Sequence, residues 1–86
     1  MFKLPEQIII NHVEDLYHQL KVVLDSGEDV VLDISQVGKA DTAGLQLLCV
    51  IQKSLTDTGQ KISWQGQSKS LTDTAKMIGV YDFLKL

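Results

Sequence analysis

The residues of this sequence most able to carry chemistry are an aspartate and a threonine at the expected start of a helix. Asp41-Thr42-Ala43-Gly44 opens a stripe of apolar residues at helical spacing, and the Asp41 carboxylate can accept a hydrogen bond from an N–H group of the first turn. The positive end of a helix favours an anion by roughly 0.3–1 kcal/mol, so the Thr42 hydroxyl could accept a phosphate without unfolding its own helix. That phosphate would add about −1.5 to −2 charges beside Asp41 and change the surface that a partner meets. An ordinary capped helix start explains the same four residues, and local chemistry alone does not separate the two interpretations.

Histidine and cysteine have simpler explanations here. His12 and His18 lie six residues apart, about 240° around a helix, and cannot form the same-face pair that a metal site needs. Cys49 lies in the most apolar helical segment, where a thiol usually packs as a small hydrophobic group. We therefore expect surface histidines, a core cysteine, no metal site and no cofactor.

The pair Gly38-Lys39 suggests a phosphate-binding P-loop, but the rest of that motif is missing. The motif needs glycine at position 33 and serine or threonine at position 40, whereas this chain has Asp33 and Ala40. The carboxylates form no visible acid–base pair, and no nucleophile has a local signature. We expect no catalytic residues and no enzymatic activity.

Trp64 and Gly44 each allow two interpretations. Trp64 on an alternating strand should be half buried, although tryptophan is also enriched at the centres of interfaces. Gly44 in a first helical turn costs up to about 1 kcal/mol relative to alanine. Its small size suits either close packing of the helix on the sheet or room for a partner's backbone.

The composition is that of a single small globular domain. The 86 residues are 44% apolar and 22% charged, so residues 1–86 should bury a small core as one domain. The longest apolar run, from Leu47 to Ile51, is far below the roughly 20 residues of a spanning helix. Met1-Phe2-Lys3 opens no signal peptide, and a single cysteine fits a reducing compartment. We expect a cytoplasmic protein without membrane insertion.

The basic residues are all lysines, and the formal net charge is −3. Arginine is the usual reader of guanine edges and phosphates. Its absence argues against nucleic-acid binding and against phosphoryl-transfer chemistry.

Hydrophobic periodicity predicts the elements ahead of the threonine. A short apolar strand is expected over residues 6–10, followed by a helix over residues 12–25 with Asn11 as its N-cap. A strand covered on both faces is expected over residues 29–34, because its centre is a continuous apolar run rich in β-branched side chains.

The helix that carries Thr42 follows a loop formed by residues 35–40. It is expected over residues 42–58, capped by Asp41 and ending before Gly59. Its apolar stripe is wide, so this helix should be largely buried.

The last third of the sequence predicts a half-buried strand over residues 61–65 and a third amphipathic helix. Ser70-Leu71-Thr72-Asp73 is similar to a capping box at the start of that helix, which should end at Gly79. The apolar tail over residues 81–86 either adds an edge strand or packs beneath the sheet. The predicted class is therefore α/β, with a small mixed sheet of about four strands and three helices packed against it.

The sequence resembles the STAS family, the domain of anti-sigma-factor antagonists. The resemblance rests on Val31-Leu32-Asp33-Ile34-Ser35, Asp41-Thr42-Ala43-Gly44-Leu45 and Leu47-Leu48. Leu4-Pro5, the Asn11 helix start and Ile78-Gly79-Val80 also fall where that family has them. The resemblance thus covers nearly the whole chain.

By this resemblance Thr42 is a phosphorylation site, and Asp33 and Asp41 are the two acids near it. The implied partner is an anti-sigma protein with serine/threonine kinase activity, which binds the unmodified antagonist and releases the phosphorylated form. We expect the partner-binding residues to be Asp33, Asp41, Thr42, Ala43 and Gly44. Another branch of the family implies a different role, an accessory subunit on the ATPase of a lipid-transporting ABC system, and a scaffold in a chemotaxis or other signalling complex is a further alternative.

Overall fold

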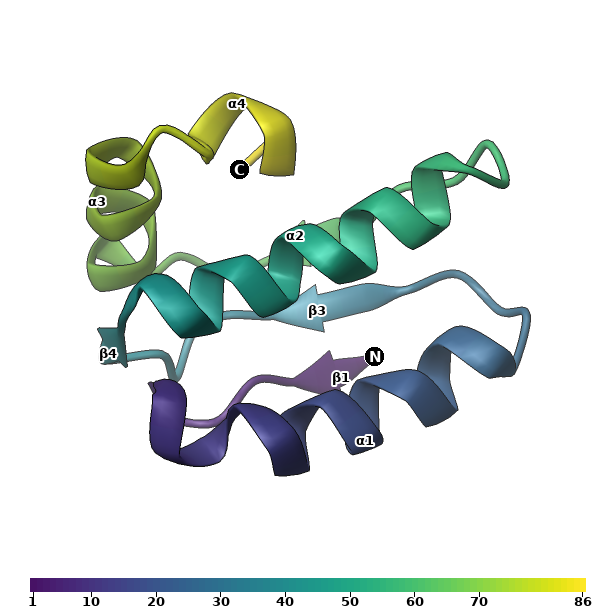
Figure 1. The fold of residues 1–86 in the computed structure, drawn as a ribbon, viewed down its shortest axis with the longest axis horizontal. Helices are drawn as coiled ribbons and strands as arrows, with labels where there is room; N and C mark the ends of the chain where they lie inside the picture. Colours follow the sequence, from purple (N-terminus) through teal and green to yellow (C-terminus); the bar gives the residue numbers. More distant parts are fainter.

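The computed structural model describes every residue from Met1 to Leu86 and confirms the α/β class (Figure 1). The strands are β1 (Phe2–Lys3), β2 (Gln7–Ile8), β3 (Val31–Asp33), β4 (Lys39–Ala40) and β5 (Ser63–Gln65). The helices are the short 3₁₀ turn η1 (Ile10–His12) and the α-helices α1 (Val13–Asp25), α2 (Thr42–Thr56), α3 (Lys69–Ile78) and α4 (Tyr81–Leu84).

The strands form two small sheets rather than the one mixed sheet that the sequence suggests. β3 lies between β1 and β5 in the larger sheet, while β2 pairs with β4. Every pair is parallel, with Phe2 opposite Leu32 and Leu32 opposite Trp64. The physical reason is that a helix separates the two strands of each pair, so the chain returns to the sheet in the same direction.

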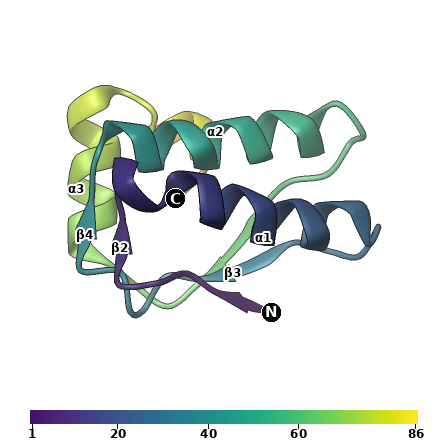
Figure 2. The same cartoon turned by 60° about the horizontal axis from the view of Figure 1, so that its bottom comes forward.

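The layers are simple. Figure 2 shows α1 and α2 side by side over one face of the larger sheet, while α3 stands across one end. α2 lies in the middle of this arrangement, in contact with α1, α3 and α4. Its buried apolar side chains, which form the largest share of the core from any one element, are Leu45, Leu47, Leu48, Ile51 and Leu55.

The expectation of a largely buried helix after Asp41 is thus confirmed. None of the helices has the length and apolar character needed to cross a bilayer.

The start of α1 differs from its prediction. Asn11 lies inside the η1 turn, and no side chain caps either η1 or α1. The backbone amide of Ile10 donates instead to the carboxylate of Asp41, at 2.9 Å. A contact with a residue far along the chain therefore replaces the local cap that the Asn11 prediction assumed.

The N-terminal strand is also divided. The expected strand over residues 6–10 is reduced to β2, and the preceding residues form β1. Pro5 separates the two, since proline has no N–H group to donate to a ladder. β4 is a further short strand inside the expected loop over residues 35–40.

The cap of α3 is Ser68 rather than Ser70. The Ser68 hydroxyl accepts from the Leu71 amide at 3.1 Å and donates to the Val37 carbonyl at 2.7 Å. The helix ends at Gly79 in the left-handed conformation, as predicted. Ser68 is preferred because it caps the helix and also ties it to the loop after β3.

The apolar tail folds as the short helix α4 and not as an edge strand. Its Leu84 side chain is fully buried. The Leu84 carbonyl accepts from the Trp64 ring nitrogen at 2.9 Å and from the Gln52 side-chain amide at 3.2 Å. Two donors from distant elements therefore fix the tail in place.

Candidate functional site

Asp41 joins two parts of the chain at the start of α2. Its backbone is extended, and one carboxylate oxygen (Oδ1) accepts from the Gly44 amide at 2.9 Å. The other oxygen (Oδ2) accepts from the Ile10 amide at 2.9 Å. The predicted N-cap is therefore confirmed, and the same carboxylate also holds η1 against the helix start.

Hydrogen bonding keeps this carboxylate ionised. The amide of Gly44, and after it that of Ile10, lowers the pKa of Asp41 below its ordinary value of 3.8. Burial opposes the shift, while the Ala43 amide and the Lys39 charge add to it. Asp41 is thus a fixed negative charge where the helix dipole favours one.

Thr42 is the first residue of α2, and its side chain is exposed. Its hydroxyl makes no hydrogen bond within the chain, in contrast to the hydroxyls of Thr56 and Thr58, which donate to carbonyls of the same helix. Ala43 beside it is half buried. The structure therefore presents a free hydroxyl at the positive end of the longest helix.

Gly44 is buried beneath this surface, so the structure gives it a packing role, and its expected part in partner binding stays a prediction. A Cβ atom at Gly44 would overlap the backbone carbonyl of Ile8. Of the two interpretations of this glycine, the structure supports close packing of α2 on β2. Gly44 contributes by letting the helix start lie against the strand.

Asp33 makes no hydrogen bond to the other expected site residues. It is half buried at the end of β3, where it accepts from the Ser35 amide at 2.9 Å. Hydrogen bonds from Ser35 lower its pKa, with a smaller effect from Lys3. No hydrogen bond links it to Asp41 or Thr42. Asp33 shapes the end of the strand. Its Oδ1 atom also lies close to Gly66, which follows β5, because a Cβ atom added at Gly66 would be only 3.0 Å from it.

Ile10 is a residue of this region that the sequence did not reveal. The pattern placed it in a strand, but its side chain is 62% exposed and its turn contacts α2. No local signal could have identified it, because its position depends on a bond to Asp41. We call the exposed or half-buried group Ile10, Asp41, Thr42 and Ala43 the α2-start surface.

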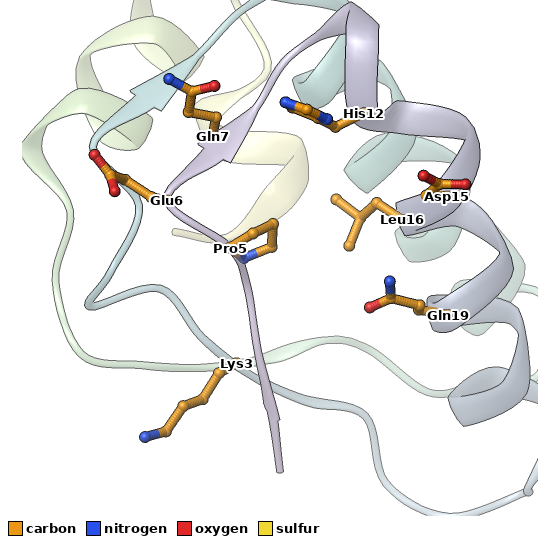
Figure 3. A pocket seen from close by; sticks show the side chains of 8 residues that line it. All are labelled: Lys3, Pro5, Glu6, Gln7, His12, Asp15, Leu16 and Gln19. Carbon is orange, nitrogen blue, oxygen red and sulfur yellow. The ribbon is translucent and has the colours of Figure 1, made fainter.

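A polar cleft lies elsewhere, between the N-terminal segment and α1. Figure 3 shows His12, Asp15 and Gln19 on the helix side, and Lys3 and Glu6 extending away from them on the other side. The polar groups do not converge on one point, as acid–base chemistry would require. None of the expected site residues lines this cleft.

The remaining candidates have structural roles or are exposed. His12 and His18 are on the surface, and no group of three His, Cys, Asp or Glu side chains could hold a metal ion. Cys49 is half buried, and burial raises the pKa of its thiol. Trp64 packs against the core, and its ring nitrogen is bonded to the Leu84 carbonyl. That packing is the first of the two interpretations offered for Trp64.

Comparison with known proteins adds one match. Residues 2–85 match the model of a family described as Mlab, STAS domain. No curated protein gives a significant match. The matched span includes the α2-start surface and all of the helices and strands, and it leaves out only Met1 and Leu86.

Proposed function

The chain belongs to the STAS domain family, whose members commonly mediate protein–protein interactions in regulatory or accessory roles, and from this premise we propose that it is a regulatory binding domain of the anti-sigma-factor antagonist type. The α2-start surface is the proposed contact, and the proposed partner is a serine/threonine kinase or anti-sigma factor. Phosphorylation of Thr42 is the proposed switch.

The observation that carries the proposal is the free Thr42 hydroxyl. It is exposed at a helix start and has no partner inside the chain. A kinase could therefore reach it without unfolding α2, and a partner could bond to it directly. The fold around it does not depend on the hydroxyl, because Asp41 makes the capping bonds.

The charges around Thr42 explain why a phosphate would act as a switch. Asp41 is ionised next to it, and Lys39 is the nearby cation that acts on Asp41. A phosphate adds about −1.5 to −2 charges to this place. The chain has no arginine that could hold it in a two-pronged contact. The phosphate would stay on the surface, where a docking partner has to desolvate it.

The proposal is one of binding and not of catalysis. The α2-start surface holds one carboxylate and one hydroxyl, and both Asp41 oxygens are occupied by backbone amides. A base that activates Thr42 has to lie within hydrogen-bond reach, so the lack of a hydrogen bond from the Thr42 hydroxyl supports a binding role.

Three variants test this function. The tagged chain is purified from its native cell, phosphate is mapped by mass spectrometry, and the co-purified partner is quantified. Thr42→Ala should lose the phosphate and keep the partner. Thr42→Glu should weaken partner binding by about tenfold or more, because an unpaired carboxylate is costly in an interface.

Ser54→Glu is the matched control, since it adds the same charge to an exposed position of the same helix. It should leave partner binding unchanged. Absence of phosphate at Thr42 in the native protein, together with undiminished binding by Thr42→Glu, would reject the switch.

A second candidate is a constitutive accessory subunit, on the ATPase of a lipid-transport ABC system or in a chemotaxis complex. The observation that favours it is the exposed Ile10 side chain, on the turn whose amide bonds to Asp41, since an exposed apolar group at the α2-start surface suits a permanent contact. In that case Thr42→Ala should itself loosen the complex. The same variant therefore separates the two candidates.

A further inference from the structure

A second surface lies away from Thr42, between β1 and the C-terminal half of α1. It is a cleft of about 290 Å³ that we call the N-terminal cleft. Its apolar lining residues are Met1, Phe2, Val22, Val23 and Val31. Figure 1 shows the amino terminus beside the C-terminal half of α1, while α2 begins near the other end of that helix.

The fold does not require an apolar residue at the rim of this cleft. Val22 follows the buried Leu20 by two positions, about 200° around the helix axis, and its side chain is 72% exposed. Phe2, Val23 and Val31 are only half buried. Phe2 and Val23 also pack against the core, so the apolar side chains of the lining that are largely exposed are Met1 and Val22, at 73% and 72%. Exposed apolar side chains that gather on a surface mark an interaction site more often than scattered ones do.

The charge at the cleft is negative. Glu28 and Asp29 are the charged side chains of its lining, and no lysine lines it. Neither carboxylate takes part in an ion pair; the pairs of the chain are Lys21–Asp25, Lys53–Asp57 and Lys69–Asp73. Two carboxylates without an ion pair beside an apolar hollow complement a basic, apolar ligand.

The same charges argue against other occupants. A second copy bound through a two-fold axis that passes through the cleft would bring Glu28 and Asp29 close to their own equivalents. An anionic membrane would be repelled in the same way. The volume is at the lower end of small-ligand pockets, which suits an anchoring side chain rather than a cofactor.

We propose that the N-terminal cleft binds a basic amphipathic segment of a partner protein, with an aliphatic side chain in the hollow and lysine or arginine against Glu28 and Asp29. This surface is separate from the α2-start surface. It does not depend on the function proposed for Thr42, and one molecule can hold two partners at once.

The test uses two synthetic peptides with one apolar pattern. The first combines leucine with lysine, and the second has glutamate at each lysine position. Binding to the full chain is measured by fluorescence anisotropy, and the site is mapped from amide shifts in NMR spectra. The lysine peptide should bind saturably and more weakly as salt rises, with shifts at Val22, Val23 and Val31, and the glutamate peptide should not bind.

Matched variants test the two halves of the cleft. Val22→Ser should weaken binding by about tenfold, the loss expected when one buried valine contact is removed. Glu28→Lys should also weaken it. The controls are Val50→Ser and Glu14→Lys, which change exposed residues elsewhere and should leave binding unchanged. Thermal midpoints verify that every variant is folded.

Several results would overturn the proposal. These are no saturable binding at millimolar peptide, equal binding of the glutamate peptide, or shifts centred on Thr42. Concentration-dependent shifts of the same cleft in the free protein would show a second copy as the occupant. Binding to vesicles of anionic lipid that outcompetes the peptide would show a membrane.

Discussion

At Gly44 the start of helix α2 lies directly against the backbone of strand β2. Alanine is the better helix former by about 1 kcal/mol, so its absence here has a cause outside the helix. That cause is the Ile8 carbonyl, which occupies the space of a Cβ atom. The α2-start surface therefore depends on a residue that is itself buried beneath it.

We predict that Gly44→Ala destabilises the protein by about 1–3 kcal/mol, the usual cost of overpacking, despite the gain in helix propensity. The helix start would have to move away from β2. Urea unfolding measures the change. Gly38→Ala is the control, because a Cβ atom there meets only the Glu6 side chain at an ordinary distance of 3.6 Å. Equal stability of Gly44→Ala and wild type would contradict the prediction, because it would show that β2 can move away at little cost in free energy.

At the scale of single residues, the sequence predicted a hydrogen bond that joins near neighbours in the chain. Asp41 caps the amide three residues on, and an aspartate before a helical stripe predicts that bond. The second bond of Asp41, to Ile10, joins positions with no sequence relation. The exposure of Ile10 goes with that junction, so it could not be read from a local pattern. Close packing at Gly44 was one of the two interpretations that the sequence allowed.

Among the elements, α1 and α2 were predicted to within two residues because each has a long apolar stripe. α3 also has such a stripe, but two serines compete for its start. Only the contact of Ser68 with Val37 decides between them. α4 has too few residues to show a period, and its conformation depends on donors from α2 and β5.

Gln52 is the side chain that ties these elements together. It is 1% exposed, it donates to the carbonyls of Phe83 and Leu84, and it accepts from the Ile62 amide at 2.7 Å. We predict that Gln52→Leu destabilises the protein by about 1–3 kcal/mol, because the buried Ile62 amide loses its acceptor.

The Trp64 ring N–H resonance reports the effect on α4, since its partner is the Leu84 carbonyl. It should shift in Gln52→Leu. Gln46→Leu, an exposed change on the same helix, should alter stability by no more than about 0.5 kcal/mol. An unchanged unfolding midpoint in Gln52→Leu would mean that water or a rearranged tail satisfies Ile62.

For the whole molecule, two carboxylates link folding to acid pH. Asp33 and Asp41 both have a lowered pKa in the folded chain. The two ionised carboxylates therefore stabilise the folded state fully at a pH above their unfolded pKa of about 3.9. This stabilisation is lost as the pH falls through their lower pKa in the folded chain. We predict that Asp41→Asn is less stable than wild type at neutral pH, and that this difference shrinks below about pH 4.

Urea midpoints at several pH values measure this linkage. Asparagine can still cap the Gly44 amide, so most of the lost energy belongs to the charge and to the Ile10 bond. Glu14→Gln, an exposed carboxylate without a hydrogen bond in the structure, should follow the wild-type curve. Parallel curves for Asp41→Asn and wild type at all pH values would contradict the prediction.

The parallel pairing of every strand also determines when the chain can fold during its synthesis. β1 pairs with β3, and β3 with β5, and each partner arrives only after an intervening helix. On a ribosome the first strand must wait, unpaired, until β3 has left the exit tunnel, and the central strand must then wait for β5. The domain can close only after β5 has left the tunnel, and its folding should be slow for its size, since ladders between distant segments carry a high entropy of closure.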